Sequence, residues 1–307
     1  MLLEDSLWMT KYRPKNISEY VFSNAQQKAQ IEEWIKNQTI PQCIFYGPPG
    51  TGKSSLALAL MPELNIDPYD ILFINASREN SVDNMRNRIT SFVSTMPYGK
   101  MRVVILDEAD GLSFESQKCL RGIMEQFPAR FILTANYPNK ILPAIHSRTQ
   151  SLEIHKLDIN DFTAKMAEIL LAEQVEFELD ILDDYVRGSW PDLRKCINNC
   201  QLNSIGGFLR RPNSGNVSSQ DYKIEAVELF KKNKFREARQ LICSQIRMEE
   251  LDEFFKFLYS NLDLFGKTPE QQDQAILIIR KSLVQIPLVA DAEILVSATI
   301  TELLNIS

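Results

Sequence analysis

The first half of the chain alternates short apolar runs with longer amphipathic stretches. The apolar runs predict β-strands at residues 42–46, 71–75, 102–107, 131–135 and 151–154. Apolar positions three or four apart predict helices at residues 26–36, 54–60, 82–95 and 115–126. Strands that alternate with helices are typical of an α/β fold, so we expect a five-stranded parallel sheet with helices on both faces.

After His155 the strand pattern stops, and the periodicity becomes helical. The segment 205–220 holds three glycines and a proline among several Ser and Asn residues, which predicts a linker. The tail, residues 221–307, has helical periodicity throughout. We therefore expect an α/β domain, a small helical domain and an all-helical tail domain, at residues 1–155, 156–207 and 218–307.

Composition narrows the possible classes of protein. The chain has 307 residues, of which 44% are hydrophobic and 24% charged, as in ordinary globular proteins. Charged residues interrupt every long apolar stretch, and the first residues do not form a secretion signal, so we expect no membrane span. Five scattered cysteines argue against a disulfide framework and favour the cytoplasm, while two histidines argue against a His-rich metal site. The net charge of −6 still allows a local basic patch.

The strongest chemical signal is GPPGTGKS, from Gly47 to Ser54, between a predicted strand and a predicted helix. Glycines let backbone N–H groups turn around phosphate oxygens, and the helix N-terminus adds partial positive charge. Lys53 is expected to reach the β- and γ-phosphates of ATP, and the Ser54 hydroxyl to ligate Mg²⁺. The alternative is a turn that only joins the two elements. The expected nucleotide contacts in this segment are Gly47, Pro48, Pro49, Gly50, Thr51, Gly52, Lys53, Ser54 and Ser55.

A second signal is VVILDEAD, an apolar run that ends in acids. Carboxylates at the carboxyl end of a central parallel strand point into the crevice where α/β sheets bind ligands. Asp107 is placed to hold Mg²⁺, and Glu108 is placed to polarise the water that attacks the γ-phosphate. The alternative is a solvated acidic turn after a strand, which is less favoured beside a phosphate loop.

The acids are followed by SQKCLRGIMEQFPARFILTANYPNKILPAIHSRTQ. The order of segments in this stretch resembles AAA+ ATPases, and more narrowly the small subunits of sliding-clamp loaders of the replication factor C type. The resemblance implies that Asn136 is the first sensor and that Ser147 and Arg148 are the arginine-finger pair, which acts on the nucleotide of the next subunit. Thr149 stands where the family usually has Cys. WPDLRKCIN is similar to the second-sensor helix, with Arg194 as the sensor.

The N-terminal segment WMTKYRP resembles the part of the family that lies beside the adenine, which implies nucleotide contacts by Tyr12, Arg13 and Pro14. The resemblance covers about the first 200 residues. The short length and the helical tail are similar to the ATPase subunit of T4-type bacteriophage clamp loaders, which would place the protein in the host cytoplasm.

The resemblance also implies partners. Copies of the chain and a distinct small subunit would form a ring or spiral, held by the helical tail as a collar. ATP would let this assembly open a sliding clamp on primer-template DNA, and DNA-stimulated hydrolysis would release the clamp. Arg78, Asn80, Lys118 and Lys140 would contact DNA, Arg121 would couple DNA to the ATP site, and Phe92 or Tyr98 would contact the clamp.

Simpler interpretations of these residues stay open. The two lysines suit a solvated surface equally well, Arg121 suits a structural ion pair, and Phe92 suits a hydrophobic core. Arg148 suits a surface salt bridge, and Arg194 suits an ordinary arginine on a helix surface. Asn136 could instead cap a helix.

Two other functions are also possible. One is a different AAA+ motor, either a protein unfoldase or a branch-migration helicase. The segment ASRENSV lacks the aromatic residue that an unfoldase pore loop needs, and the tail lacks the strand pattern of a winged DNA-binding domain. The other is a scaffold that binds nucleotide without hydrolysing it. The presence of Lys53, Asp107, Glu108 and Arg148 together argues against a scaffold.

Overall fold

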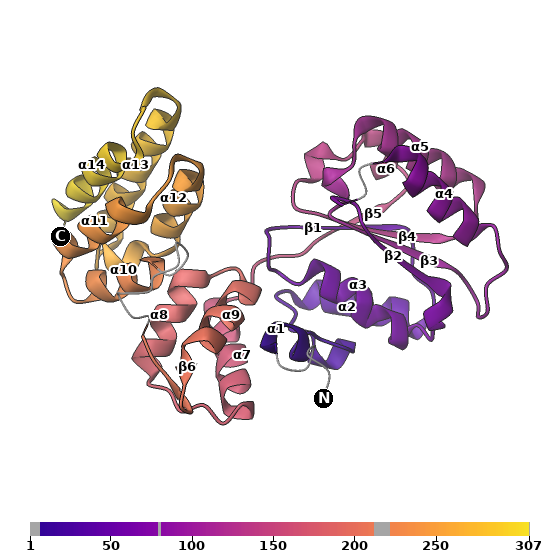
Figure 1. Cartoon of the computed structure of the whole chain (residues 1–307), viewed down its shortest axis with the longest axis horizontal. Coiled ribbons are helices and arrows are strands. Elements are labelled where there is room, and N and C mark those ends of the chain that lie inside the picture. Colours follow the sequence, from indigo (N-terminus) through magenta and orange to yellow (C-terminus); the bar gives the residue numbers. More distant parts are fainter. Residues whose placement is uncertain (1–6, 79–80, 212–221, 307) are drawn as a thin grey trace. The chain divides into compact units, whose positions relative to one another are not determined.

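The computed structural model describes residues 7–78, 81–211 and 222–306 (Figure 1). The chain divides into two compact units, Met1–Asp161 and Phe162–Ser307, and each is described by itself. The first unit holds both chemical motifs of the sequence, and the second consists mainly of helices.

The first unit is built on one five-stranded parallel sheet. Its strands are β1 (Cys43–Tyr46), β2 (Ile71–Asn75), β3 (Val103–Asp107), β4 (Arg130–Ala135) and β5 (Gln150–Glu153). Their order in the sheet is β2-β3-β4-β1-β5, and every neighbouring pair is parallel. The predicted sheet is confirmed, and each strand begins and ends within one residue of its expected bounds. Because the strands are parallel, all five carboxyl ends lie at the same edge.

Helices cover both faces of this sheet, as Figure 1 shows: α2 and α3 lie on one face, and α4 and α5 on the other. Ile44 belongs to the hydrophobic cluster under α4 and α5, whereas its neighbours Cys43 and Phe45 belong to the cluster under α2 and α3. This burial on both sides explains why the strands are continuous apolar runs. The helices of the unit are α1 (Trp8–Lys11), α2 (Ala25–Lys36), α3 (Lys53–Glu63), α4 (Val82–Val93), α5 (Phe114–Gln126) and α6 (Pro143–His146).

Side-chain caps fix where the long helices begin. Asn24 caps α2, Ser81 caps α4 and Ser113 caps α5, each by accepting a hydrogen bond from a backbone N–H of the first turn. In contrast, the residue before α3 is a left-handed Gly52, which makes no side-chain cap. The N–H groups at the start of α3 therefore have no capping side chain, in keeping with a site that binds anions.

The second unit is a set of helices with one short hairpin. After α7 (Ile159–Ala172), which crosses the unit boundary, its helices are α8 (Leu179–Ser189), α9 (Leu193–Asn203), α10 (Tyr222–Lys231), α11 (Phe235–Gln245), α12 (Leu251–Ser260), α13 (Pro269–Gln285) and α14 (Ala292–Leu304). Lys231 of α10 forms ion pairs with Asp180, Asp183 and Asp184 of α8. The boundary between domains at residues 156–207 and 218–307 stays a prediction.

The linker prediction is wrong over its first residues. Strands β6 (Ser204–Ile205) and β7 (Phe208–Leu209) form an antiparallel hairpin there. Gly206 and Gly207 have φ values of +66° and +81°, which are the values a tight two-residue hairpin turn requires. The same Gly-Gly pair is typical of linkers, so the sequence pattern did not distinguish the two. The rest of the predicted linker, from residue 212 on, lies outside the described residues.

Within the described ranges, none of the helices is both long enough and apolar enough to cross a lipid bilayer.

Candidate nucleotide-binding site

The glycine loop connects β1 to α3 at the carboxyl edge of the sheet. Gly47 has a φ of +152°, and a Cβ atom there would lie 2.2 Å from the backbone oxygen of Ile154, so no side chain fits. Gly50 and Gly52 also have positive φ, at +72° and +89°. These angles turn the loop around the N-terminus of α3, where free N–H groups can face an anion. The geometry fits the phosphate cradle predicted for this segment.

Lys53 is buried at the start of α3, with 7% of its surface exposed. Its Nζ donates hydrogen bonds to the backbone oxygens of Gly47 and Pro48, at 2.9 and 2.6 Å. The ammonium group therefore lies inside the loop, where a phosphate would compete with these two carbonyls.

Tyr20 packs over the glycine loop, a role that no pattern in the sequence predicts. Its hydroxyl donates to the backbone oxygen of Thr51 at 3.4 Å, and its ring edge lies 3.1 Å from where a Cβ of Gly52 would be. Burial raises the pKa of this phenol, which therefore stays protonated as a donor. Tyr12, Arg13 and Pro14 lie directly after α1 in the same unit, and their contact with adenine stays a prediction.

Three oxygen-bearing side chains meet beside the loop. The Ser54 hydroxyl donates to Oδ1 of Asp107, and the Thr134 hydroxyl donates to the same oxygen at 2.6 Å. Ser54 is the second residue of α3, Asp107 ends β3 and Thr134 lies near the end of β4. Serine and aspartate oxygens are the kind of ligand that Mg²⁺ prefers, so the pair predicted to hold Mg²⁺ fits the ion. Thr134 was missed because a threonine in a strand usually reflects β propensity.

Glu108 has a left-handed backbone, with a φ of +55°. This conformation is unfavourable for a residue other than glycine. The Thr134 hydroxyl supports it by accepting a hydrogen bond from the Glu108 N–H at 3.0 Å. The side chain of Glu108 is exposed, whereas the strand before it is buried. The sharp turn therefore brings the Glu108 carboxylate out of the sheet at the edge where the glycine loop lies.

A second acid, Asp110, fixes the loop after β4. Its Oδ2 accepts hydrogen bonds from the N–H groups of Asn136 and Tyr137, at 3.2 and 3.0 Å. The predicted sensor Asn136 is thus tied through its backbone to the segment that carries Glu108. From α5, the buried Gln117 donates to the backbone oxygen of Lys140 at 3.0 Å, which anchors the far end of the same loop.

Arg148 follows α6 and is partly exposed. Its Nη1 donates to the backbone oxygen of Ala144 at 2.6 Å and to Ser147 Oγ at 3.0 Å. Its Nη2 forms an ion pair with Oε1 of Glu125 on α5, and the Arg121 Nε lies 3.7 Å from the same oxygen. The exposed position suits a side chain that acts on a neighbouring subunit, although that role stays a prediction.

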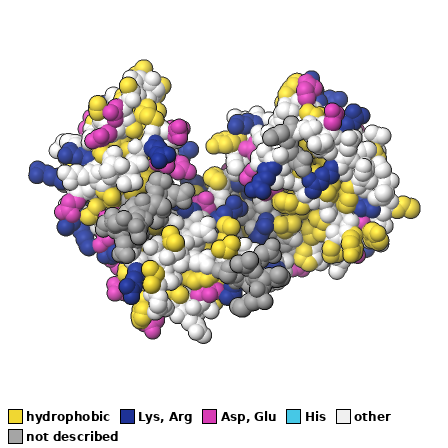
Figure 2. All heavy atoms as spheres, viewed as in Figure 1, with side chains coloured by type: hydrophobic (Ala, Val, Ile, Leu, Met, Phe, Trp, Pro, Cys, Tyr) yellow, Lys and Arg dark blue, Asp and Glu magenta, His cyan; other side chains and the backbone are white. Residues whose placement is uncertain are grey.

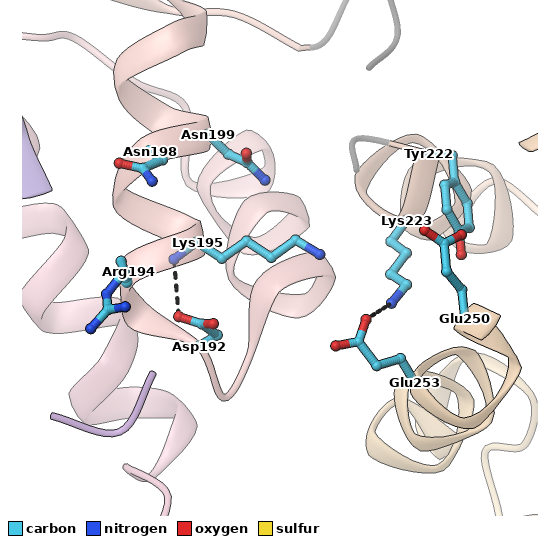
Figure 3. A pocket seen from close by; sticks show the side chains of 9 residues that line it. All are labelled: Asp192, Arg194, Lys195, Asn198, Asn199, Tyr222, Lys223, Glu250 and Glu253. Carbon is cyan, nitrogen blue, oxygen red and sulfur yellow. Dashed lines mark hydrogen bonds and ion pairs between the residues drawn. The ribbon is translucent and has the colours of Figure 1, made fainter. Parts of the chain in front are cut away.

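Arg194 lies in the second unit, on α9, and is exposed. A polar cavity of about 300 Å³ in this unit is lined by residues of α9, α10, α12 and the short turn before α12. Figure 3 shows Lys195 extending toward Lys223 across this cavity, and Arg194 leaving α9 on the opposite side. Burial, and next the Lys195 charge, lower the pKa of Lys223, which pairs with Glu253 at 3.4 Å. The role of Arg194 as a second sensor stays a prediction.

The predicted DNA contacts lie on the surface of the first unit. Lys118 pairs with Glu115 at 3.2 Å and lies 4.2 Å from the centre of the Phe114 ring, while Lys140 lies 4.7 Å from that of Tyr137. Both lysines are exposed, and so is Arg78. Asn80 lies outside the described residues. DNA contact by these residues stays a prediction.

The two predicted clamp contacts differ in exposure. Phe92 is half-buried against the core, and the Arg102 guanidinium lies 4.5 Å from its ring centre. Tyr98, by contrast, is 77% exposed, and its ring lies 5.6 Å from that of the equally exposed Tyr69. Figure 2 shows hydrophobic side chains at the surface of this unit, on the right of the view. Of the two residues, Tyr98 is therefore the better placed to meet a partner.

A buried ion pair lies beneath the loop that carries Tyr98. Arg102 and Asp70 are 8% and 0% exposed, and Nη1 of the arginine lies 3.6 Å from Oδ1 of the aspartate. Asp70 also accepts hydrogen bonds from the N–H groups of Tyr98 and Gly99, at 2.9 and 2.6 Å. Arg102 donates to the backbone oxygen of Met96 at 2.6 Å. The loop that carries Tyr98 is thus fixed from beneath.

Comparison with known proteins gives a family for the chain. The sequence profile of the ATPase family associated with various cellular activities (AAA) matches residues 43–156. The replication factor C small subunit of Picrophilus torridus is 35% identical over 247 residues, which are 77% of this chain and 77% of that protein. The corresponding subunit of Sulfurisphaera tokodaii is 37% identical over 212 residues, which are 67% of this chain. The chain spans 64% of the length of this second relative. Both relatives are archaeal, so the narrower resemblance to bacteriophage subunits stays a prediction.

Solved structures agree on the fold. A RuvB variant from Thermotoga maritima superposes with a TM-score of 0.55 and 15% sequence identity, over 80% of this chain and 90% of that one. At this level of identity the likeness concerns architecture alone. It is consistent with the AAA+ sheet and with the helical region that follows it.

Proposed function

Because the chain belongs to the family of replication factor C small subunits, we propose that it is an ATPase subunit of a sliding-clamp loader. The observation that carries the proposal is the meeting of Ser54, Asp107 and Thr134 beside a glycine loop in which Gly47 has no room for a Cβ atom. A scaffold that only binds nucleotide would not need Glu108 turned out of the sheet at this edge.

Lys53, the N-terminus of α3 and the loop N–H groups would bind the phosphates of ATP. Ser54 and Asp107 would hold Mg²⁺, which when bound neutralises charge on the phosphate oxygens. For this the Ser54 hydroxyl, now a donor to Asp107, turns its lone pair outward, and Thr134 keeps Asp107 in place. The ion and the nucleotide are thus accommodated by side chains that already lie together.

Glu108 would accept a proton from the attacking water as the γ-phosphate departs. Asn136 would orient this water or the γ-phosphate, since its backbone is tied through Asp110 to the segment of Glu108. Arg148 would come from the adjacent subunit and stabilise charge on the γ-phosphate, and Arg194 would contact the nucleotide bound by its own chain. Hydrolysis would then require an oligomer.

The partners would be further copies of the chain, a distinct small subunit, a sliding clamp and primer-template DNA, all in the cytoplasm. Lys118 and Lys140 would follow the DNA backbone, where exposed ammonium groups gain affinity by releasing counterions. Tyr98, with Tyr69 beside it, would contact the clamp, because exposed aromatic residues on a rigid loop are typical of binding surfaces.

The test is the steady-state ATPase rate of the purified chain, assembled with its partner subunit, with and without primer-template duplex and the clamp of the same genome. We expect a weak basal rate that rises with duplex and rises again with clamp. A rate that responds to neither, or an active monomer, would contradict the proposal.

The role of Arg148 in trans has its own test. Oligomers of Lys53→Ala or of Arg148→Ala alone should be inactive. Mixing the two should restore part of the turnover, because some interfaces then join an intact loop to an intact arginine. If Arg148 acted within its own subunit, the mixture would stay inactive.

A further inference from the structure

The Arg148 guanidinium is bound within its own subunit. Nη1 donates hydrogen bonds to the Ala144 backbone oxygen and to Ser147 Oγ, and Nη2 forms an ion pair with Glu125. Both terminal nitrogens therefore already have acceptors. An arginine finger must offer these same N–H groups to a phosphate. Arg148 must therefore break these contacts before it can act on the nucleotide of a neighbouring subunit.

The carboxylate that holds Arg148 is shared. Glu125 and Arg121 lie one turn apart on α5, and both arginines approach the same oxygen, Oε1. Arg148 is the closer of the two, while the Nε of Arg121 lies 3.7 Å away. The two guanidinium groups share the charge of one carboxylate and repel each other, so a closer contact with Arg121 weakens the contact with Arg148.

We propose that Glu125 is a positioning residue: it retains Arg148 against its own subunit, and Arg121 competes for the same carboxylate oxygen. The inference rests on the proposed function, since it needs Arg148 to act in trans. Release happens when a γ-phosphate of the neighbouring subunit replaces the carboxylate, because guanidinium groups bind both anions by the same geometry.

The hold has to be weak for this exchange to occur. The side chains of Arg148 and Glu125 are 36% and 44% exposed, so water screens their attraction. Exposed pairs of this kind change populations by no more than about fivefold. Glu125 would therefore adjust how often Arg148 is free, without deciding whether hydrolysis can occur.

The test compares Glu125→Gln with the unchanged chain in the full assembly, with and without primer-template duplex and clamp. We expect the basal ATPase rate to rise about two- to fivefold, while KM for ATP and the maximal stimulated rate change less than twofold. The basal rate of Glu125→Asp, which keeps the charge, should lie between those of Glu125→Gln and the unchanged chain. Glu32→Gln is the matched control, because Glu32 is an exposed helical acid paired with Lys28, at 3.8 Å. It should leave both rates unchanged.

Two double variants separate positioning from general structure. In an Arg148→Ala background, Glu125→Gln should not restore turnover. Arg121→Gln alone should lower the stimulated ATPase rate, because Arg148 then binds Glu125 without competition. Adding Glu125→Gln to this variant should restore the stimulated rate. Melting temperatures of all variants should agree within a few degrees.

An unchanged or lower basal rate in Glu125→Gln, with the fold intact, would overturn the positioning role and leave the proposed function standing. An unchanged chain that shows no stimulation by duplex or clamp would instead overturn the proposed function and the inference with it.

Discussion

Replacing Thr134 by valine tests whether one buried hydroxyl joins the two acids of the site. Thr134 is 1% exposed, and its hydroxyl donates to Asp107 at 2.6 Å and accepts from the Glu108 N–H at 3.0 Å. Valine keeps the shape of the side chain and removes both hydrogen bonds. Asp107 would keep only the bond from Ser54, and the left-handed turn at Glu108 would lose its support.

The magnitude follows from the kind of bond that is lost. A hydrogen bond to a charged group contributes about 1.5–3 kcal/mol, and a buried N–H left without an acceptor costs about 1–3 kcal/mol. Glu108 borders solvent, so part of the second cost is recovered by water. We expect the free energy of unfolding to fall by about 2–4 kcal/mol. If about half of this loss, about 1–2 kcal/mol, is expressed as misplacement of Glu108, kcat falls about 5- to 30-fold.

The assay is single-turnover ATP hydrolysis in the assembled protein, together with equilibrium binding of ATP. Binding should change less than about threefold, because the glycine loop and Lys53 are untouched. Thr299→Val is the matched control. Thr299 is also 1% exposed, and its hydroxyl bonds to Ser282 and to the Leu295 backbone in the helical tail. Thr299→Val should lower the free energy of unfolding by a similar amount and leave turnover unchanged. Turnover of Thr134→Val within twofold of the unchanged chain would refute the reasoning.

Three further predictions concern separate features. Glu108→Gln should slow single-turnover hydrolysis at least about 100-fold with ATP binding intact, and normal release of the clamp by this variant would argue against its role with water. Tyr98→Ala should weaken clamp binding in a pull-down or titration about tenfold or more, whereas Tyr259→Ala, equally an exposed tyrosine but in α12, should not. Lys223→Met should equal or exceed the unchanged chain in stability at pH 7. Because burial sets the folded pKa of Lys223 below its ordinary 10.5, the unchanged chain gains stability as pH rises from the folded pKa toward 10.5. The variant's advantage in chemical denaturation should therefore shrink at pH 10, and a growing advantage would contradict this assignment.

Much of the fold could be predicted because its signals are local. Each central strand is an apolar run, and each helix has its own periodicity. The predicted bounds of the five strands therefore agree with the structure within one residue. The glycine loop and the acids after β3 were also found, because each lies within a few consecutive residues. The hairpin at residues 204–209 was missed because Gly-Gly serves linkers and tight turns equally.

The supporting residues of the site could not be predicted, because their partners are distant in sequence. Thr134 reaches Asp107 across 27 positions, and Tyr20 reaches Thr51 across 31. Nothing around either residue differs from an ordinary strand or loop. Glu125 illustrates the same limit, since an acid on an exposed helix face usually indicates only solubility, and its link to Arg148 depends on how α5 and α6 pack.

The position of β4 in the sheet has a practical consequence. It lies between β3, which ends at Asp107, and β1, which leads into the glycine loop. The residues that follow β4 are therefore adjacent to both halves of the chemistry, and Tyr137 among them is exposed while its backbone is bound to Asp110. A tryptophan introduced at this position would be an optical probe next to the reaction, and the change in its emission, measured above that of the three natural tryptophans, would report turnover without any added label.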